Sequence, residues 1–414
     1  MDNKQLDKAY EKEFKDSLGL TNYDPRVFEA EHVHLFDVEW VDEKGEKHIN
    51  KGYRVQWNNK NGPYKGGLRF HPSVTLDLFK RLAFEQTFKN ILTTLPMGGA
   101  KGGSDFDPHG KSDKDIRAFC EAFMDKLHPF IGVEKDIPAG DIGVGGNEIR
   151  YLYERYMKVT GKSDCSLTGK PLDLGGSLCR KEATGYGLCY LTSKLLDTCL
   201  STSFKGKTVV ISGSGNVAIY AAEKAIQLGA KVVALSDSTS AIYVPEGINL
   251  DIVKEIKEVR KGRIKEYPGV EVIPTHDIWK IKCDIALPCA TQNEIDLDGA
   301  KALVSNGCKV VCEGSNMSCT EEAVKYFHEK GIYYVPGKAS NAGGVSVSGL
   351  EIEQNKLNEH WSFEKVDARL KDIMENIFIN ISNTARKDGK GIDFVYGANK
   401  YAYDKLIELY EANV

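Results

Sequence analysis

The chain has 414 residues, of which 55 are basic, 59 acidic and 41% hydrophobic, and its formal net charge is −4. This composition is typical of a globular protein, and the length predicts two or three domains that can each bury a core. The near-neutral charge argues against nucleic-acid binding, and no apolar run approaches the roughly 20 residues that a membrane helix needs.

The N-terminus and the cysteines indicate a cytoplasmic protein. The first residues, MDNKQLDKAYEKEF, are charged and lack the apolar stretch of a secretory signal. The ten cysteines are scattered, and we expect reduced thiols that pack as small apolar groups. Cys308, Cys312 and Cys319 come nearest to a metal pattern, but no histidine lies at ligand spacing. We therefore predict no metal site.

The first 175 residues mix strand-like pieces, such as His48 to Trp57, with amphipathic helical patterns. The segment 64–70, YKGGLRF, places Lys65 beside paired glycines. Apolar spacing from Thr75 to Thr93 predicts a helix that is capped by Thr75 or Ser73. Gln86 and Lys89 are three residues apart in this helix, so they share one face.

Two glycine-rich segments, 96–103 and 138–146, each place one ionisable residue among residues with almost no side chain. These residues are Lys101 and Asp141, and we expect both segments to be functional loops, with flexible surface loops as the alternative. If Lys65, Lys89 and Lys101 converge, they form an anion pocket in which Lys101 is a usable base near neutral pH. Asp141 would then move protons to a substrate nitrogen. Solvated surface lysines are the alternative for each of them.

A different sequence pattern begins after the segment LDLGGS. This segment predicts a hinge near residues 173–177. We therefore predict a first domain at 1–175 and a second at 176–398, with a final helix at 399–414 that returns to the first. Apolar runs alternate with helical stretches in the second domain, as in an α/β fold with a doubly wound, Rossmann-like parallel sheet. The predicted strands are 208–212, 231–235, 283–287, 309–312 and 332–335.

The sequence after the first of these strands indicates a dinucleotide site. Gly213 to Ala218 reads G-x-G-x-x-A between a strand and a helical pattern that continues to Leu228. Such glycines allow a tight turn and a close approach of the backbone to a pyrophosphate. Asp237 follows the next strand, where an acid would bind a ribose hydroxyl. The alternative is a structural turn.

Six segments in this order resemble the hexameric glutamate dehydrogenases over nearly the whole chain: YKGGLRFHP, FEQTFKNILTTLPMGGAKGG, PAGDIGVGGNE, SGSGNVA, EGSNM and NAGGVSVSGLE. The chain is most similar to their shorter, NADP-dependent type. The resemblance implies an N-terminal substrate and oligomerisation domain and a homohexamer. It also implies an enzyme that converts L-glutamate to 2-oxoglutarate and ammonium, and that assimilates ammonia in reverse, with NADP as coenzyme and NAD possible.

The resemblance also implies residue roles. Lys101 would activate the attacking water and Asp141 would transfer protons. The implied substrate-binding residues are Lys65 and Ser348 for the side-chain carboxylate, Gln86 and Lys89 for the α-carboxylate, and also Arg180 and Asn341. The implied coenzyme-binding residues are Thr184, Gly213, Ser214, Gly215, Asn216, Val217, Ser236, Asp237, Lys257, Arg260, Ala290 and Asn316.

Two opposed signals bear on the coenzyme. Asp237 alone favours NAD, because an acid there repels a 2′-phosphate. The segment 254–265, KEIKEVRKGRIK, places Lys257 and Arg260 three residues apart, where the resemblance implies phosphate-binding cations. If both lie on one helix face they suit a phosphate, so we predict a preference for NADP. A solvated helix face is the alternative.

Two other functions stay open. A leucine- or phenylalanine-type dehydrogenase would share Lys101 and Asp141 but would carry apolar residues in place of Lys65 and Ser348. A dinucleotide-binding sensor without catalysis would need neither Lys101 nor Asp141, and their presence argues against it.

Overall fold

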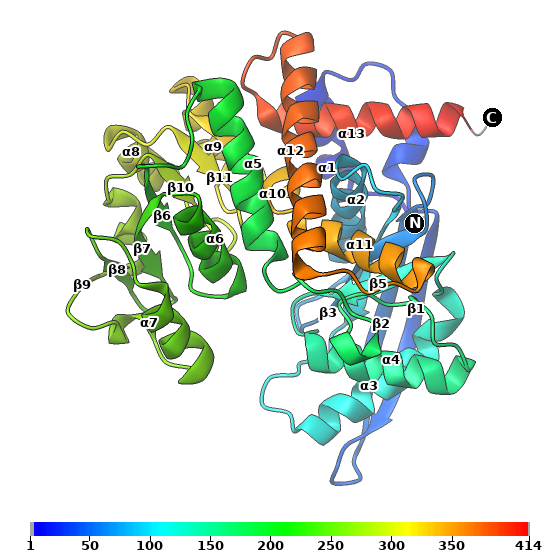
Figure 1. Cartoon of the computed structure of the whole chain (residues 1–414). Helices are drawn as coiled ribbons and strands as arrows, with labels where there is room; N and C mark the ends of the chain where they lie inside the picture. The colour runs from blue at the N-terminus through cyan, green and yellow to red at the C-terminus, as the bar shows by residue number, and fades with distance from the viewer. Residues whose placement is uncertain (1–3, 413–414) are drawn as a thin grey trace. The chain divides into compact units, whose positions relative to one another are not determined.

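A computed structural model of the protein describes residues 4–412, which form two compact units (Figure 1). The first unit holds the described residues up to Leu178, residues 347–366 and those from Ala402 onward, and the second holds Cys179–Ser346 and Asp367–Tyr401. The sequence analysis placed 347–366 in the second domain. One continuous helix, α11 (Gly343–Leu357), runs through this boundary, so the sequence pattern does not change there.

A mixed five-stranded sheet forms the centre of the first unit. Across the sheet the strands are β1 (His32–Val41), β2 (Lys47–Asn58), β4 (Gly99–Ser104), β3 (Tyr64–Phe70) and β5 (Asp136–Gly140). The β1–β2 and β2–β4 pairs are antiparallel, whereas β3 runs parallel to both β4 and β5. This topology places β3 between β4 and β5, which include parts of the two glycine-rich segments.

The expectation of two glycine-rich loops was wrong in part. Lys101 lies within strand β4, and residues 138–140 of the segment 138–146 belong to strand β5, which ends just before Asp141. The glycines allow the backbones of neighbouring strands to pack closely together. A Cβ atom at Gly66 would lie 1.6 Å from the Ala100 carbonyl oxygen, and one at Gly103 would lie 1.8 Å from the Arg69 carbonyl oxygen. Only glycine fits at such positions.

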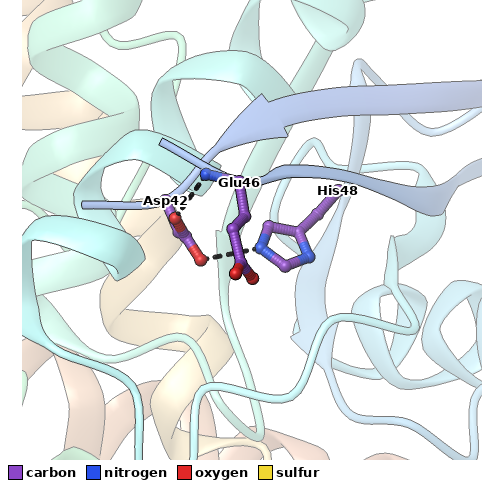
Figure 2. A group of neighbouring side chains, drawn as sticks. All are labelled: Asp42, Glu46 and His48. Atoms are coloured by element: carbon purple, nitrogen blue, oxygen red, sulfur yellow. Dashed lines mark hydrogen bonds and ion pairs between the residues drawn. The ribbon is translucent and has the colours of Figure 1, made fainter. Parts of the chain in front are cut away.

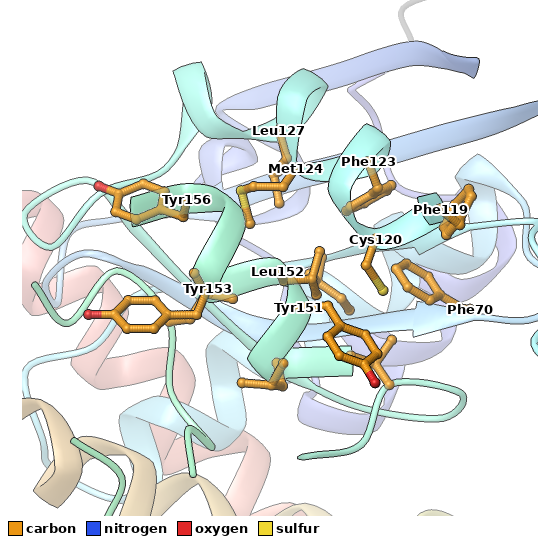
Figure 3. Close-up of a cluster of buried hydrophobic side chains, with 14 of the residues drawn as sticks. Phe70, Phe119, Cys120, Phe123, Met124, Leu127, Tyr151, Leu152, Tyr153 and Tyr156 are labelled. Carbon is orange, nitrogen blue, oxygen red and sulfur yellow. The ribbon is translucent and has the colours of Figure 1, made fainter. Parts of the chain in front are cut away.

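Helices of the first unit cover this sheet. They are α1 (Lys8–Leu18), α2 (Leu76–Leu92), α3 (Asp113–Leu127) and α4 (Gly146–Thr160). The predicted helix at 75–93 is confirmed as α2, and Thr75 caps it by accepting a hydrogen bond from the Leu78 N–H. Aromatic and aliphatic side chains of α3, α4 and the sheet form a buried cluster that includes Phe70, Phe119 and Leu152 (Figure 3).

A seven-stranded sheet forms the centre of the second unit. Across the sheet the strands are β12 (Tyr333–Val335), β11 (Val310–Cys312), β10 (Ile285–Leu287), β6 (Thr208–Ile211), β7 (Lys231–Ser236), β8 (Ala241–Tyr243) and β9 (Glu271–Ile273). The five predicted strands and the α/β class are confirmed, and these strands run parallel. The antiparallel strands β8 and β9 were not predicted.

The remaining helices precede, alternate with or follow the strands of the second sheet along the chain. They are α5 (Ala183–Leu200), α6 (Asn216–Gln227), α7 (Leu250–Lys254), α8 (Leu297–Ser305), α9 (Glu321–Glu329), α10 (Gly337–Ser340), α12 (Phe363–Lys387) and α13 (Phe394–Glu411). Helix α13 corresponds to the predicted final helix, whose residues 413–414 lie outside the described residues, and from Ala402 it belongs to the first unit. In the described part of the chain, no helix is long and apolar enough to span a membrane.

Candidate functional site

Lys101 and Asp141 lie side by side in the first unit. Lys101 Nζ is 3.2 Å from Asp141 Oδ2, and Arg69 Nε donates a hydrogen bond to the same oxygen at 3.0 Å. Lys101 comes from β4, Arg69 from β3 and Asp141 from the residue after β5. Three adjacent strands therefore bring one carboxylate against two cations.

The two cations control the charge of Asp141. Burial alone would raise the pKa of this carboxyl group, but Lys101 and Arg69 lower it below its usual value through their charges and hydrogen bonds. Asp141 is therefore ionised at neutral pH and can accept a proton. This arrangement suits acid–base chemistry, because a proton can pass between groups at this distance.

Gly67 makes the approach of these groups possible. A Cβ atom at this position would lie 2.8 Å from the Gly140 carbonyl oxygen, 2.9 Å from Asp141 Cβ and 3.3 Å from Lys101 Nζ. Any larger residue would push β3 away from β5 or displace the lysine. The second glycine of the segment 64–70 is thus required by the geometry of the lysine–aspartate pair.

The sequence analysis missed Arg69. Side chains alternate between the two faces of a strand, so Lys65, Gly67 and Arg69 lie on one face of β3. That spacing was present in YKGGLRF and could have indicated a second cation for Asp141. It was not used because the strand was not recognised as one.

A second buried ion pair supports β3. Arg54 donates to both carboxylate oxygens of Asp136 at 2.9 and 2.5 Å, and to the Gly66 carbonyl oxygen at 3.1 Å. Both side chains are fully buried. Arg54 extends over Gly102, whose missing Cβ would lie 3.0 Å from Arg54 Cδ. The pair thus connects β2 with β5 past the two strands that carry Lys101 and Lys65.

Lys65 is 1% exposed and lines a cavity of about 330 Å³ within the first unit. Most of the other lining residues are apolar: Pro63, Leu95, Pro96, Met97, Ile137, Gly349, Ile352 and Leu357, with Glu353 and Lys356. Ser348, which is 2% exposed, precedes the part of α11 that lines this cavity. The structure therefore places Lys65 and the α11 segment that holds Ser348 around one enclosed space.

Gln86 and Lys89 lie on α2, next to β3. Gln86 Nε2 donates to Asn90 Oδ1 at 2.7 Å, and Asn90 Nδ2 donates to the Lys65 carbonyl oxygen at 3.1 Å. Lys89 is half-buried on the same helix. Asn90 therefore couples the helix to the strand that carries Lys65.

The glycine motif of the second unit forms the predicted turn between β6 and α6. Gly213 has a φ of +85° and donates its N–H to Ser236 Oγ at 2.9 Å. Around Gly215 the position of a Cβ is open space, and among the described residues no side chain caps the N-terminus of α6. Exposed N–H groups at a helix N-terminus bind phosphate, so the turn fits a dinucleotide pyrophosphate.

Asp237, which was predicted to bind a ribose hydroxyl, is hydrogen-bonded within its own loop. Its Oδ1 accepts from the Thr239 N–H and hydroxyl, and its Oδ2 accepts from the Ile264 N–H at 2.8 Å. Lys257 Nζ lies 3.6 Å from Oδ2. Burial would raise the pKa of Asp237, but the bonds to Thr239 and Ile264 and the Lys257 charge lower it to about 2. The Asp237 carboxylate is therefore hydrogen-bonded within its own loop, and the Lys257 charge partly neutralises it.

Lys257 and Arg260 do not form a pair on one helix face, which corrects the sequence analysis. Helix α7 ends at Lys254, residues 255–259 form a π-helical turn, and Arg260 ends it. Lys257 donates to the Gly262 carbonyl oxygen, whereas Arg260 contacts Glu255 and Glu266.

A cation missed by the sequence analysis is Arg263, whose Nη1 donates to Ser238 Oγ at 3.1 Å, directly after Asp237. Lys257 also lines a cavity of about 440 Å³ together with Ser214, Gly215 and Asn216 of the turn. The basic side chains around the loop after β7 therefore include Arg263 as well as Lys257.

The other predicted coenzyme positions, and the predicted substrate contacts Arg180 and Asn341, lie in the second unit. Asn341 Nδ2 donates to Asn316 Oδ1 at 2.8 Å, and Ala290, after β10, donates its N–H to Glu294. Thr184 and Arg180 both lie against Gly344, where an added Cβ would be 2.9 Å from Thr184 Oγ1 and 3.3 Å from Arg180 Nη1. Val217 follows Asn216 in the first turn of α6.

Within residues 4–412, one group of acidic and histidine side chains has its potential ligand atoms within 4.8 Å of one another: Asp42, Glu46 and His48 (Figure 2). Asp42 Oδ2 contacts His48 Nε2 at 2.9 Å, and Asp42 Oδ1 accepts from the Glu46 N–H. Asp42 also donates its N–H to the Glu46 carbonyl oxygen. These are the contacts of the hairpin turn between β1 and β2.

A parallel doubly wound sheet with a glycine turn at the carboxyl end of a central strand, together with a lysine–aspartate pair, defines the class of dinucleotide-dependent oxidoreductases. Family models match at residues 175–413 (Glutamate/Leucine/Phenylalanine/Valine dehydrogenase) and at residues 30–158 (Glu/Leu/Phe/Val dehydrogenase, dimerisation domain). The chain belongs to the glutamate/leucine/phenylalanine/valine dehydrogenase family, which confirms the resemblance.

Similar proteins share most of the chain. An NADP-specific glutamate dehydrogenase of Helicobacter pylori is 51% identical over 392 residues, covering 92% of this chain and 87% of the relative. An NAD(P)-specific glutamate dehydrogenase of Xylanibacter ruminicola is 52% identical over 387 residues with the same coverage. The crystal structure of a Plasmodium falciparum glutamate dehydrogenase has a TM-score of 0.91 at 49% identity and covers 93% of this chain and 84% of that one.

Proposed function

We propose that the protein is an NADP-dependent glutamate dehydrogenase that interconverts L-glutamate with 2-oxoglutarate and ammonium. The observation that carries this proposal is the Lys101–Asp141 contact on strands adjacent to the one that holds the buried Lys65. A dicarboxylate needs a cation for each carboxylate once water is excluded. Lys65 on β3 and Lys89 on α2 can supply these two cations, while Lys101 supplies a base.

Each residue of the first unit then has a role. Once its proton has moved to the ionised Asp141, Lys101 can accept a proton from the water that attacks the carbon bearing the nitrogen, and Asp141 transfers protons to and from the substrate nitrogen. Lys65 and Ser348 bind the side-chain carboxylate. The remaining proposed substrate contacts are Gln86 and Lys89 for the α-carboxylate, with Arg180 and Asn341 of the second unit.

The second unit would hold NADP, which supplies the hydride acceptor when bound. Ser214, Gly215 and Asn216 provide backbone N–H groups for the pyrophosphate, and Gly213 forms the turn with its positive φ. Ser238 and Arg263 offer donors for a 2′-phosphate, because Asp237 is already engaged by its own loop. The remaining proposed contacts are Thr184, Val217, Ser236, Lys257, Arg260, Ala290 and Asn316.

We also propose a homohexamer and a cytoplasmic location. The family model over residues 30–158 is described as a dimerisation domain, and a 27% identical structure with a TM-score of 0.90 is titled as a hetero-hexameric glutamate dehydrogenase from Thermus thermophilus. Nine of the ten cysteines are buried free thiols, as expected in a reducing compartment. Sedimentation of the purified protein would give six copies of the 45.9-kDa chain.

Oxidation of NADPH during reductive amination tests the function. With ammonium present, 2-oxoglutarate should be turned over efficiently and a branched-chain 2-oxoacid poorly, because an apolar side chain cannot form an ion pair with the Lys65 ammonium group. The same assay with NADH measures the coenzyme preference. Faster turnover of the branched-chain acid would contradict the proposal and favour a leucine-type enzyme.

A further inference from the structure

Glu313 is a buried carboxylate that none of the roles above uses. It follows β11 directly, within the EGSNM segment, and is 1% exposed. Its two oxygens accept hydrogen bonds from two different parts of the chain. Oε1 accepts from the Cys319 N–H at 2.8 Å, and Oε2 accepts from the Gly337 N–H at 2.8 Å. One side chain thus connects the loop after β11 with the start of α10.

These two segments carry the pair Asn316 and Asn341. Asn316 lies between Glu313 and Cys319 in the loop, and Asn341 ends α10, which begins at Gly337. Asn341 Nδ2 donates to Asn316 Oδ1 at 2.8 Å. A Cβ atom at Gly337 would lie 3.2 Å from both Glu313 Oε2 and Asn341 Nδ2, so the carboxylate and the amide pack against the same glycine.

The side-chain oxygen of Asn341 is also available to accept a hydrogen bond from a ligand. Asn341 is 6% exposed, and its Oδ1 accepts no hydrogen bond from any described residue. A buried amide oxygen of this kind is costly unless a donor reaches it. The hydrogen bond from Nδ2 to Asn316 fixes the orientation of the Asn341 amide and therefore the direction of its Oδ1. A shift of the loop after β11 or of α10 would change that direction.

We propose that Glu313 is a positioning residue for coenzyme binding, which acts by holding the Asn316 and Asn341 segments in register. This inference rests on the proposed function, which makes Asn316, the hydrogen-bond acceptor of Asn341, a coenzyme contact. Glu313 itself does not contact the coenzyme. Two backbone donors on two separate oxygens require a carboxylate, because an amide offers a single acceptor oxygen.

The test compares Glu313→Gln with a matched variant, Glu294→Gln. Glu294 also accepts two backbone N–H bonds, from Ala290 and Thr291, but both converge on Oε1. A glutamine can satisfy both bonds of Glu294, whereas at Glu313 its NH₂ group would oppose one backbone N–H. We expect the NADPH dissociation constant, measured by fluorescence titration without substrate, to rise about tenfold in Glu313→Gln and to stay within about twofold in Glu294→Gln.

A double-mutant cycle with Asn341→Ala separates positioning from a general loss of structure. If Glu313 acts through the pair, Glu313→Gln should raise the dissociation constant by less than about twofold once Asn341 is alanine. A full tenfold effect in that background, or an unchanged constant in Glu313→Gln alone, overturns the proposal. If Glu313→Gln does not fold, Glu313→Asp takes its place, because the shorter carboxylate cannot reach both segments. Absence of NADPH binding in the unsubstituted protein would instead contradict the proposed function.

Discussion

The lysine site of the first unit and the dinucleotide turn of the second unit handle charge in opposite ways. In the first unit, ionised side chains of the sheet and its strand ends are packed together, with Lys101 and Arg69 on Asp141 and with Arg54 on Asp136. In the second unit, backbone N–H groups and hydroxyls at strand ends provide the polar contacts, as for Gly213 and Ser236.

This difference predicts how each region responds to substitution. A buried ion has few replacements for its partner, so the loss of one side chain in the first unit leaves an uncompensated charge. The main chain makes most contacts of the turn, so single side chains there contribute less. The largest effects should therefore fall in the first unit.

The largest expected effect is on turnover. Lys101→Ala removes the base and the charge beside Asp141, and each of these roles contributes about 10²–10⁴-fold, so kcat should fall by several orders of magnitude. NADPH binding should be unchanged, because the turn lies in the other unit. The exposed Lys111→Ala serves as a control with normal kcat. Near-normal turnover of Lys101→Ala would remove this residue from the proposed mechanism.

The next effect is on stability. Arg54→Met leaves Asp136 buried without its partner, and the free energy of unfolding should fall by about 3–5 kcal/mol, as measured by urea denaturation. Arg54→Met/Asp136→Leu removes both charges and should recover most of that loss. A double variant as unstable as the single one would show that the hydrogen bonds to Gly66 and Gln56 matter more than the ion pair.

Lys65→Met tests substrate specificity. If Lys65 binds the side-chain carboxylate, the KM for glutamate and 2-oxoglutarate should rise by an amount equivalent to about 2–5 kcal/mol. Monocarboxylic amino acids should be affected little, since they make no such contact. Equal weakening of both substrate classes would assign Lys65 a structural role.

Smaller effects are expected at the three cations near the loop after β7 in the second unit. Lys257→Ala, Arg260→Ala and Arg263→Ala should each raise the KM for NADPH, by about tenfold at most, and leave that for NADH nearly unchanged. Arg263 should show the largest change, because it lies on Ser238 while Arg260 is engaged by two glutamates. Efficient turnover of NADH by the unsubstituted enzyme, unaffected by all three changes, would contradict the preference for NADP.

The smallest effect is a pH dependence of stability at Asp237. Its pKa is lowered from 3.8 to about 2 because hydrogen bonds from Thr239 and Ile264 outweigh burial. A depressed pKa in the folded state stabilises the fold above the unfolded pKa, and this contribution is lost as the pH falls from 3.8 toward 2. Asp237→Asn should reduce the slope of unfolding free energy against pH in this window. An unchanged slope would show that the loop holds the neutral side chain equally well.

Much of the architecture follows from local patterns. Helix α2 and the five parallel strands of the second unit were predicted from periodicity and apolar runs, and the glycine turn was found because strand, turn and helix are contiguous in the chain. Strand β4 was mistaken for a loop, because glycines do not indicate a strand. The backbone of the neighbouring strands lies so close to these positions that only glycine fits, and the sequence does not show this contact.

The sequence by itself determined the family, the fold class, the dinucleotide turn and the lysine and aspartate that form the candidate acid–base pair. Tertiary structure alone decided which charges meet. Arg54 and Asp136 are 82 residues apart in the chain, and only the strand order β2-β4-β3-β5 brings them together. Likewise, the Ile264 N–H and Lys257 contact the Asp237 carboxylate, and the local motif around Asp237 does not specify these contacts. Local motifs specify the conformation of adjacent residues, whereas the pairing of distant charges depends on how the strands pack.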